Sequence, residues 1–320
     1  MVLLYALPAS AASKPKIGFI LSTMQEERYQ RDKKAFGEEV ERLGGEVVFA
    51  SCNNSEQTQA AEVENLLSQG IRSLVIQAVN GDTASAYVKQ AKQDGVPVVA
   101  YDRLIRNAPL DAFITEDSYS VGKAQAEAAV KFTHGKGNYV LLMGEAGQSG
   151  TVARTAGVLE TLKKYPAIHL VVQQTHKGWS PNLAMQTTEN ALTRYANDIQ
   201  AVIANNSGMA NGAVQALEEQ KLTGKVFVAG ADADLTAIRN IAQGKQQLDV
   251  MISIQDQARH AAEVAMALAE KRDFHVDQLT DNGMKQVKTV NSPVFPIDKD
   301  RIEERIIKTG FHTREAVFGK

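Results

Sequence analysis

Hydrophobic and polar positions follow two different periods along this chain. Short runs of β-branched and apolar residues are separated by longer stretches of helical periodicity. The first pattern is typical of buried strands and the second of amphipathic helices. Strands are predicted at 17–20, 46–50, 74–78, 96–101, 112–115, 139–143, 170–172, 201–204, 226–229 and 250–254. Helices are predicted at 32–43, 57–69, 84–93, 120–132, 181–195, 212–220 and 257–270.

This alternation predicts parallel sheets, because each crossover helix must cover one face of the sheet that its two strands share. A single doubly wound sheet rarely needs ten strands, so two smaller sheets fit better. The length of 320 residues also suggests two domains at roughly 150 residues each. The predicted fold class is therefore α/β, with two doubly wound parallel-sheet lobes.

An internal repeat supports two related halves. Residues 74–102 and residues 201–232 each contain a strand, an Asn, a helix, a second strand and a final Asp. The final residues are Asp102 and Asp232, and open parallel sheets bind ligands beyond the carboxyl ends of their strands. One such Asp is more often a helix cap or a turn former. Two at matched positions favour a role in ligand binding.

Charge and cysteine content exclude several classes of function. The 35 Lys and Arg residues against 37 Asp and Glu residues leave a net charge of −2, which argues against nucleic acid as a partner. No two of the six His residues are spaced i, i+4, and Cys52 is the single cysteine. A zinc site or a disulfide framework is therefore not expected.

The N-terminus indicates export. Val2–Leu7 is an apolar run, and Ala9-Ser10-Ala11 follows it as a small-residue cleavage pattern. Residues 1–13 are therefore predicted to be the remnant of a secretory signal, although the usual basic start is missing. The alternative is an apolar tail on a cytosolic protein. No cysteine is available here for a lipid anchor, so we expect a soluble periplasmic protein.

A glycine-rich loop follows the predicted strand 139–143. Its sequence, Gly144-Glu-Ala-Gly-Gln-Ser-Gly150, is neither the dinucleotide-binding pattern nor a Walker loop. It also lacks the second Gly of a nucleophile elbow. We interpret it as a tight βα turn, and we expect no cofactor and no catalytic residues.

Polar and aromatic residues gather at the predicted strand ends. They are Arg28, Tyr29, Asn80, Asp102, Arg103, Arg154, Trp179, Asn206 and Asp232. This set suits a neutral polyol, because carboxylates and Asn accept hydrogen bonds from hydroxyls while Arg donates to them. Aromatic rings can pack on the apolar C–H faces of a sugar. The alternatives are that Trp179 only packs on the next helix and that Arg28 is a solvated charge.

Several motifs together resemble the D-xylose-binding branch of the type 1 periplasmic sugar-binding proteins, which serve ABC transporters. They are Lys16–Ile20, Glu27–Asp32, Ala100–Arg103, Gly178-Trp179-x-Pro181, Gly212–Leu217, Gly230–Leu235 and Phe295–Asp298. The resemblance implies an N-terminal lobe of residues 14–114 and 255–287, and a C-terminal lobe of residues 115–254 and 288–320. Three crossings would form the hinge. The implied sugar contacts are Arg28, Tyr29, Asp102, Arg103, Trp179, Asn206 and Asp232.

The sequence departs from that branch at two places. An expected Asp-x-Asn is Gln148-Ser149-Gly150, and an expected lysine is Ile252. In compensation, Arg154 resembles the arginine that grips the sugar in the ribose- and galactose-binding branches. We add Gln148 and Arg154 to the predicted ligand contacts, and we expect a xylose- or glucose-like monosaccharide.

The predicted function is capture of a monosaccharide between two lobes by a monomer that delivers it to a membrane permease. Two alternatives remain open. A sugar-sensing regulator shares this fold, but only about fifteen residues precede Ile17, too few for a helix-turn-helix. A sugar- or nucleotide-modifying enzyme could use Asp102 or Asp232 as a general base.

Overall fold

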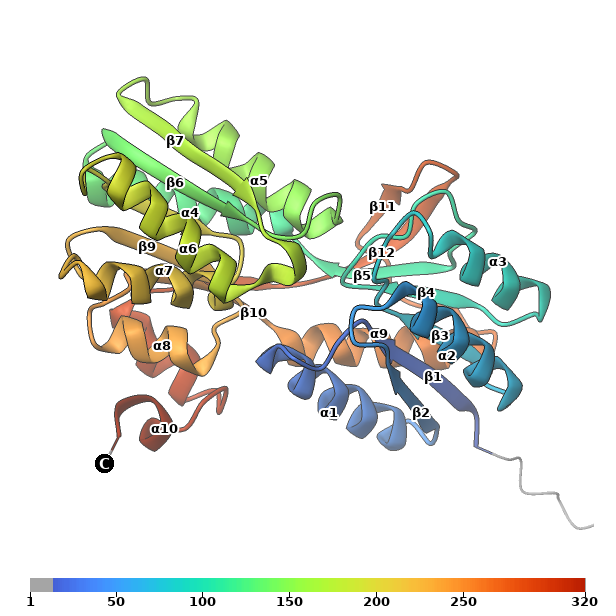
Figure 1. The fold of residues 1–320 in the computed structure, drawn as a ribbon. Coiled ribbons are helices and arrows are strands. Elements are labelled where there is room, and N and C mark those ends of the chain that lie inside the picture. The colour runs from blue at the N-terminus through green and yellow to red at the C-terminus, as the bar shows by residue number, and fades with distance from the viewer. Residues whose placement is uncertain (1–13, 320) are drawn as a thin grey trace, which may run out of the picture.

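Two α/β lobes, each built around its own sheet, make up the structure (Figure 1). The computed structural model describes residues 14–319. The N-lobe sheet contains, in spatial order, β11 (Gln278–Asp281), β12 (Gln286–Ser292), β5 (Ala112–Glu116), β4 (Val98–Tyr101), β3 (Ser73–Ile76), β1 (Lys16–Leu21) and β2 (Glu46–Ser51). The C-lobe sheet contains β13 (Val294–Ile297), β10 (Leu248–Ile252), β9 (Phe227–Ala231), β8 (Ala201–Ala204), β6 (Gly137–Met143) and β7 (Ile168–Thr175).

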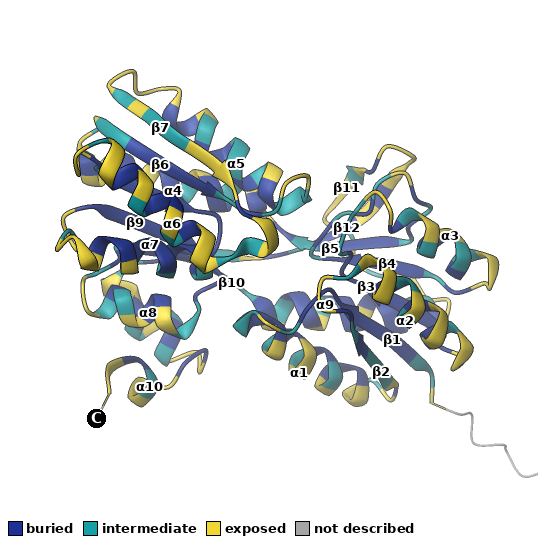
Figure 2. Cartoon of the chain, viewed as in Figure 1, coloured by how far each residue is buried: buried dark blue, intermediate teal, exposed yellow. Residues whose placement is uncertain are grey.

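Helices cover both faces of each sheet. The N-lobe sheet packs against α1 (Glu27–Arg42) and α9 (Ile254–Ala269) on one face and against α2 (Glu56–Ser68) and α3 (Ser85–Gln93) on the other. The C-lobe sheet packs against α4 (Ser118–Thr133) and α5 (Ser149–Leu162) on one face and against α6 (Pro181–Arg194) and α7 (Ser207–Glu219) on the other. The central strands are consequently buried on both sides, as Figure 2 shows in dark blue.

The C-terminal segment forms a smaller cluster beside the C-lobe sheet. It contains α8 (Leu235–Ala242), α10 (Arg314–Phe318) and short helical turns at Lys299–Arg301 and Glu303–Ile307. Apolar side chains from these elements pack with β13 and with the end of β10. This cluster brings the last residues of the described chain close to the start of α1.

The predicted α/β class with two doubly wound lobes is confirmed, and the ten predicted strands are present with shifted ends. The two sheets are mixed rather than wholly parallel, because β11 pairs antiparallel with β12 and β13 pairs antiparallel with β10. Strands β11, β12 and β13 were not predicted. The reason is local: β11 is largely exposed and β13 contains Pro296, so neither has the continuous apolar run of a buried strand.

The chain crosses between the lobes three times. The crossings follow β5, β10 and β12, and the third lies at Pro293. This position differs from the boundary at residue 287 that the resemblance implied. The cause is that β12 continues to pair with β5 from Thr289 to Ser292 and leaves the N-lobe sheet only afterwards.

The predicted secretory signal at 1–13 lies outside the described residues. Among residues 14–319, no helix has both the length and the apolar character needed to cross a bilayer.

Helices α4 and α5 approach closely at two glycines. A Cβ added at Gly122 would lie 1.9 Å from the carbonyl oxygen of Arg154, and one at Gly157 would lie 2.2 Å from that of Tyr119. No side chain fits at either position without moving one helix. This contact sets the position of Arg154, whose side chain reaches the space between the lobes.

We predict that Gly122→Ala lowers the free energy of unfolding by about 1–3 kcal/mol, because the added methyl overpacks the α4–α5 contact. Gly37→Ala in α1 is the matched control, since a Cβ there meets nothing within 4 Å. That control should raise stability by roughly 0.5–1 kcal/mol. Urea unfolding of both variants checks the prediction, and equal stabilities would contradict it.

Candidate functional site: a cavity between the lobes

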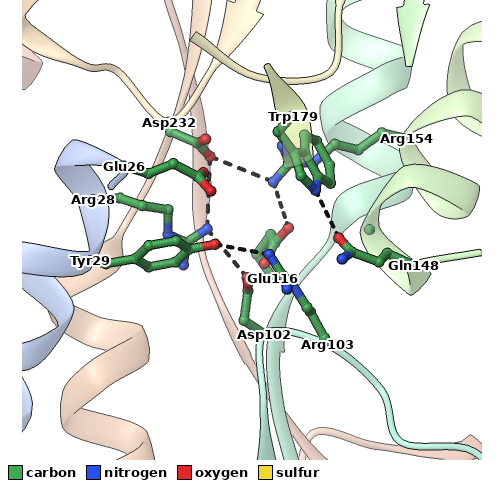
Figure 3. A pocket seen from close by; sticks show the side chains of 11 residues that line it. Glu26, Arg28, Tyr29, Asp102, Arg103, Glu116, Gln148, Arg154, Trp179 and Asp232 are labelled. Atoms are coloured by element: carbon green, nitrogen blue, oxygen red, sulfur yellow. Dashed lines mark hydrogen bonds and ion pairs between the residues drawn. The ribbon is translucent and has the colours of Figure 1, made fainter. Parts of the chain in front are cut away.

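A small polar cavity of about 30 Å³ lies between the two lobes. This space holds about two water molecules, so a larger ligand requires the cavity walls to move apart. Its walls are formed by Glu26, Arg28, Tyr29, Asp102, Arg103, Glu116, Gln148, Gly150, Arg154, Trp179 and Asp232. Figure 3 shows most of these side chains pointing toward one another from elements of both lobes.

Asp102 and Asp232 face the cavity from opposite lobes. Asp102 follows β4 and Asp232 follows β9, the matched positions of the repeat. Both have positive backbone φ, 64° and 100°, which is uncommon for residues other than glycine and is often found at functional sites. The repeated unit therefore brings two carboxylates into one cavity, as the sequence predicted.

Asp249 of β10 stabilises the loop that carries Asp232. The Asp249 carboxylate is fully buried and accepts hydrogen bonds from Ser207 Oγ at 2.9 Å and from the Ala233 N–H at 2.8 Å. Burial raises its pKa to about 7. A second layer of polar contacts thus fixes the strained turn at Asp232.

Three buried arginines surround the two aspartates. Arg28 lies on α1, Arg103 follows β4 and Arg154 lies on α5. Arg28 Nη1 is 3.2 Å from Asp102 Oδ1 and 3.8 Å from Asp232 Oδ1, so one guanidinium joins the carboxylates of both lobes. Because Arg28 is 3% exposed, its interpretation as a solvated surface charge is wrong.

Arg103 is anchored within the N-lobe, whereas Arg154 is anchored both by the C-lobe and by Glu116 at the end of β5. Arg103 donates to the Ala78 carbonyl at 3.1 Å and to the Tyr29 hydroxyl at 3.2 Å. Arg154 Nη2 donates to Glu116 Oε1 at 2.9 Å, while its Nη1 donates to the Asn205 carbonyl. The planes of these guanidinium groups are consequently fixed by protein contacts.

Glu26 and Glu116 line the cavity and were missed at the sequence level. Glu116 ends β5, so the rule that selected Asp102 and Asp232 would also have selected it. Glu26 immediately precedes α1, next to the acidic first turn of that helix. Nothing in the sequence distinguished it from an exposed surface residue. Burial raises the pKa of Glu26 to about 7, against the opposing effect of Arg103.

The two aspartates have opposite pKa shifts. Burial raises the pKa of Asp232 to about 6, although Arg154 and Arg28 oppose this effect. Burial acts on Asp102 in the same direction, but Arg28 and Arg103 outweigh it and hold the pKa of Asp102 below its ordinary value. Asp102 is therefore the more firmly ionised of the two aspartates.

Trp179 packs over the glycine-rich loop. Its indole lies so close to Gly144 that a Cβ there would be 2.4 Å from the ring, and its Nε1 donates to Gln148 Oε1 at 2.8 Å. The loop is a tight βα turn, as interpreted. The Trp179 ring packs on the C-lobe core and also lines the cavity.

Asn206 and Asn80 lie elsewhere. Asn206 is the one predicted ligand contact that does not line the cavity; its Oδ1 caps α7 by accepting from the Met209 N–H at 2.9 Å. Asn80 accepts from the Asp82 N–H at 2.9 Å within a turn. Both are explained by the preference of Asn for caps and turns. Ile252 is fully buried in the apolar cluster beside β13.

Three buried polar atoms in the cavity wall have no hydrogen-bond partner within the protein. They are Asp232 Oδ1, Glu116 Oε2 and Arg154 Nε. Buried polar atoms are almost always paired, so these three are available to a polar molecule that enters the cavity. Two carboxylate oxygens and one N–H match a molecule that donates at two positions and accepts at a third.

The two lobes are in direct contact around the cavity. Ser149 Oγ accepts from the Leu104 N–H at 3.0 Å, and Arg106 Nη1 donates to the Gly147 carbonyl at 3.1 Å. Both contacts join an N-lobe residue to a C-lobe residue. The structure is therefore a closed arrangement of the two lobes.

Comparison with known proteins agrees with this geometry. Residues 17–273 match the periplasmic binding protein domain family. The chain is 39% identical to a D-xylose-binding periplasmic protein of Escherichia coli, over 95% of this chain and 93% of that protein. It is 37% identical to a D-xylose-binding periplasmic protein of Haemophilus influenzae, over 97% of this chain and 94% of that protein.

A solved structure gives the same result for the fold. An ABC transporter solute-binding protein of Clostridium phytofermentans, with β-D-glucose bound, matches with a TM-score of 0.88 at 25% identity, over 94% of this chain and 99% of that chain. The family consists of binding proteins without catalytic activity, so the alternative of an enzyme is set aside. The chain belongs to the type 1 periplasmic binding proteins that serve as sugar-binding proteins of ABC transporters.

Proposed function

We propose that this protein captures a neutral monosaccharide, a pentose or hexose of the xylose or glucose kind, between its lobes and delivers it to a membrane permease. The observation that carries the proposal is the group of three unpartnered atoms, Asp232 Oδ1, Glu116 Oε2 and Arg154 Nε. A sugar hydroxyl both donates and accepts, so one ring can satisfy all three.

The charges of the cavity favour a neutral ligand. Four carboxyl groups and three guanidinium groups line it, and the guanidiniums already contact carboxylates or carbonyls of the protein. An anionic ligand such as a sugar phosphate would meet the carboxylates without a free cation to balance it. The rings of Tyr29 and Trp179 offer apolar surface for the C–H faces of a sugar.

Binding and closure are coupled in this proposal. A sugar that touches Asp102 on one lobe and Asp232 on the other binds the closed arrangement more tightly than the open one. It therefore shifts the population toward closure. The family implies a membrane permease as the partner, and we expect the protein to act as a monomer. The periplasmic location is that of the D-xylose-binding relatives, and it agrees with the predicted signal at 1–13.

The first prediction concerns the two repeated aspartates. Asp102→Asn and Asp232→Asn each remove a charged acceptor, and Asn tolerates the left-handed backbone at these positions. We expect each variant to bind sugar about 5- to 150-fold more weakly, corresponding to ~1–3 kcal/mol per hydrogen bond lost to a charged group. Asp94→Asn, the same chemical change at an exposed site after α3, is the control. Isothermal titration calorimetry measures the three affinities, with Trp179 emission as a second readout. Wild-type affinity in both cavity variants would disprove the shared site.

The second prediction concerns sugar preference. Gln148 and Ile252 do not supply the charged partners of the xylose-binding branch, whereas the Glu116–Arg154 pair supplies new ones on the C-lobe side. A site built for particular hydroxyls discriminates against sugars that leave its buried groups unpaired. We expect glucose to bind at least as tightly as xylose, and Arg154→Lys to weaken glucose binding by losing the Nε donor and the planar fork.

Parallel titrations with glucose, galactose, ribose and xylose test this preference. Tight binding of xylose alone, unchanged in Arg154→Lys, would refute the role of Arg154. It would leave the proposed capture of a monosaccharide intact.

A further inference from the structure

A second set of contacts joins the lobes outside the cavity. The first turn of α1 lies beside the C-terminal segment, where the blue start of α1 approaches the orange and dark red elements in Figure 1. We call these contacts the clasp, and define it as Glu27 and Arg31 of the N-lobe with Leu235, Phe311 and His312 of the C-lobe. No residue of the clasp lines the cavity.

Arg31 is the centre of the clasp. Its Nη1 donates to the Phe311 carbonyl at 2.6 Å, and its guanidinium lies 4.3 Å from the centre of the Phe311 ring. Glu27 supports it from the same helix, with Oε1 3.1 Å from Arg31 Nη2, and Glu27 Oε2 also accepts from the Leu235 N–H at 3.0 Å. One turn of α1 therefore holds the C-lobe at three points.

The hydrogen bonds of His312 fix its tautomer. His312 Nε2 lies 2.8 Å from the Ala233 carbonyl, which can only accept, so Nε2 carries the proton. Nδ1 is then an acceptor, and Arg31 Nη2 lies 3.0 Å from it. The contact with Arg31 thus requires a neutral imidazole. Burial lowers the pKa of His312, which is 6% exposed, and so favours this neutral form.

The clasp is continuous with the cavity through the backbone. Ala233 directly follows Asp232, and Arg31 lies one helical turn after Arg28. The same two segments that carry cavity side chains are therefore joined again on the outside. A movement that closes the cavity would therefore also form the clasp.

We propose that Arg31 and His312 are positioning residues that hold the lobes closed without touching the sugar, and that protonation of His312 at acid pH releases this hold. The inference rests on the proposed closure around a sugar. Protonation would remove the Nδ1 acceptor and place a second positive charge beside Arg31. The other charged groups facing His312 are Glu27, whose Oε1 is 4.0 Å from Nε2, and Arg239 of α8.

Two consequences separate the clasp from residues of the cavity. A contact made only in the closed state changes the ratio of closed to open protein, and it thereby changes the affinity for every sugar by the same factor. Because the imidazole must be neutral in the closed state, the contribution of the clasp to affinity should be constant above the ordinary His pKa of about 6.5 and be lost as the pH decreases below it. Cavity residues would instead change the preference among sugars.

The experiment uses Arg31→Gln and His312→Asn. Arg31→Gln removes the guanidinium, and its control is Arg42→Gln on the same helix, whose guanidinium contacts only Glu39 within α1. We expect Arg31→Gln to weaken glucose and xylose binding by the same factor, about 3- to 30-fold, with faster sugar dissociation in stopped-flow measurements of Trp179 emission. Arg42→Gln should bind both sugars as the wild type does.

His312→Asn keeps a side-chain acceptor for Arg31 and cannot be protonated. Wild-type affinity should fall between pH 7.5 and pH 5.5. The part of this fall that comes from protonation of Glu26 and Asp232 should remain in His312→Asn, and the rest should disappear. Unequal loss for the two sugars in Arg31→Gln, wild-type affinity in that variant, or the same pH profile in His312→Asn would each overturn the clasp.

Small-angle X-ray scattering without sugar distinguishes failure of the clasp from failure of the proposed function. A smaller radius of gyration for wild type than for Arg31→Gln at pH 7.5 supports the clasp even if no monosaccharide binds. If the protein binds no sugar and the two radii are equal, both proposals fail.

Discussion

Burial of charge between the lobes is the constraint on which the closed structure depends. Arg28, Arg103 and Arg154 are each at most 7% exposed, and the carboxylates around them lose their water at the same time. Taking such groups out of water costs several kcal/mol per ion unless partners replace the solvent. The protein supplies most of these partners. The charged groups that still have an atom without a hydrogen-bond partner are Asp232, Glu116 and Arg154, which line the cavity. The cavity therefore offers polar contacts that a bound polar molecule would use.

The topology of the sheets supplies these partners in pairs. Parallel strands end at the same edge, so β4 and β9 deliver Asp102 and Asp232 to one place from two lobes. Glu116 differs from these two aspartates in its place in the fold. It ends β5 at the first crossing between the lobes, and it forms an ion pair with Arg154 of α5. An ion pair of the cavity thus lies at the hinge itself. Residues of the first crossing and residues of the cavity are therefore in direct contact.

The sequence predicted the parts of this arrangement that depend on local pattern. Continuous apolar runs identified the parallel strands, and the repeat placed two aspartates at strand ends. The exposed β11 and the Pro-containing β13 have no such pattern, because antiparallel edge strands depend on a neighbour for their form. The residues of the cavity likewise differ in whether a local pattern predicts them. Asp102 and Asp232 at strand ends were found, but Glu116 at the end of β5 was missed. Glu26 becomes a cavity residue only when the other lobe covers it, and Asn206 caps a helix that the pattern placed a turn too late. Long-range contacts such as that of Arg31 with His312 join residues that are distant in sequence, and no local pattern predicts them.

The central claim is that the unpartnered atoms of the cavity are the partners of a sugar. The most direct test is a crystal structure of the protein grown with glucose or xylose. We predict a sugar ring in the cavity, with hydroxyl oxygens within about 3.2 Å of Asp232 Oδ1, Glu116 Oε2 and Arg154 Nε. A closed structure in which those three atoms are satisfied by water alone while the sugar binds elsewhere, or does not bind, would contradict it.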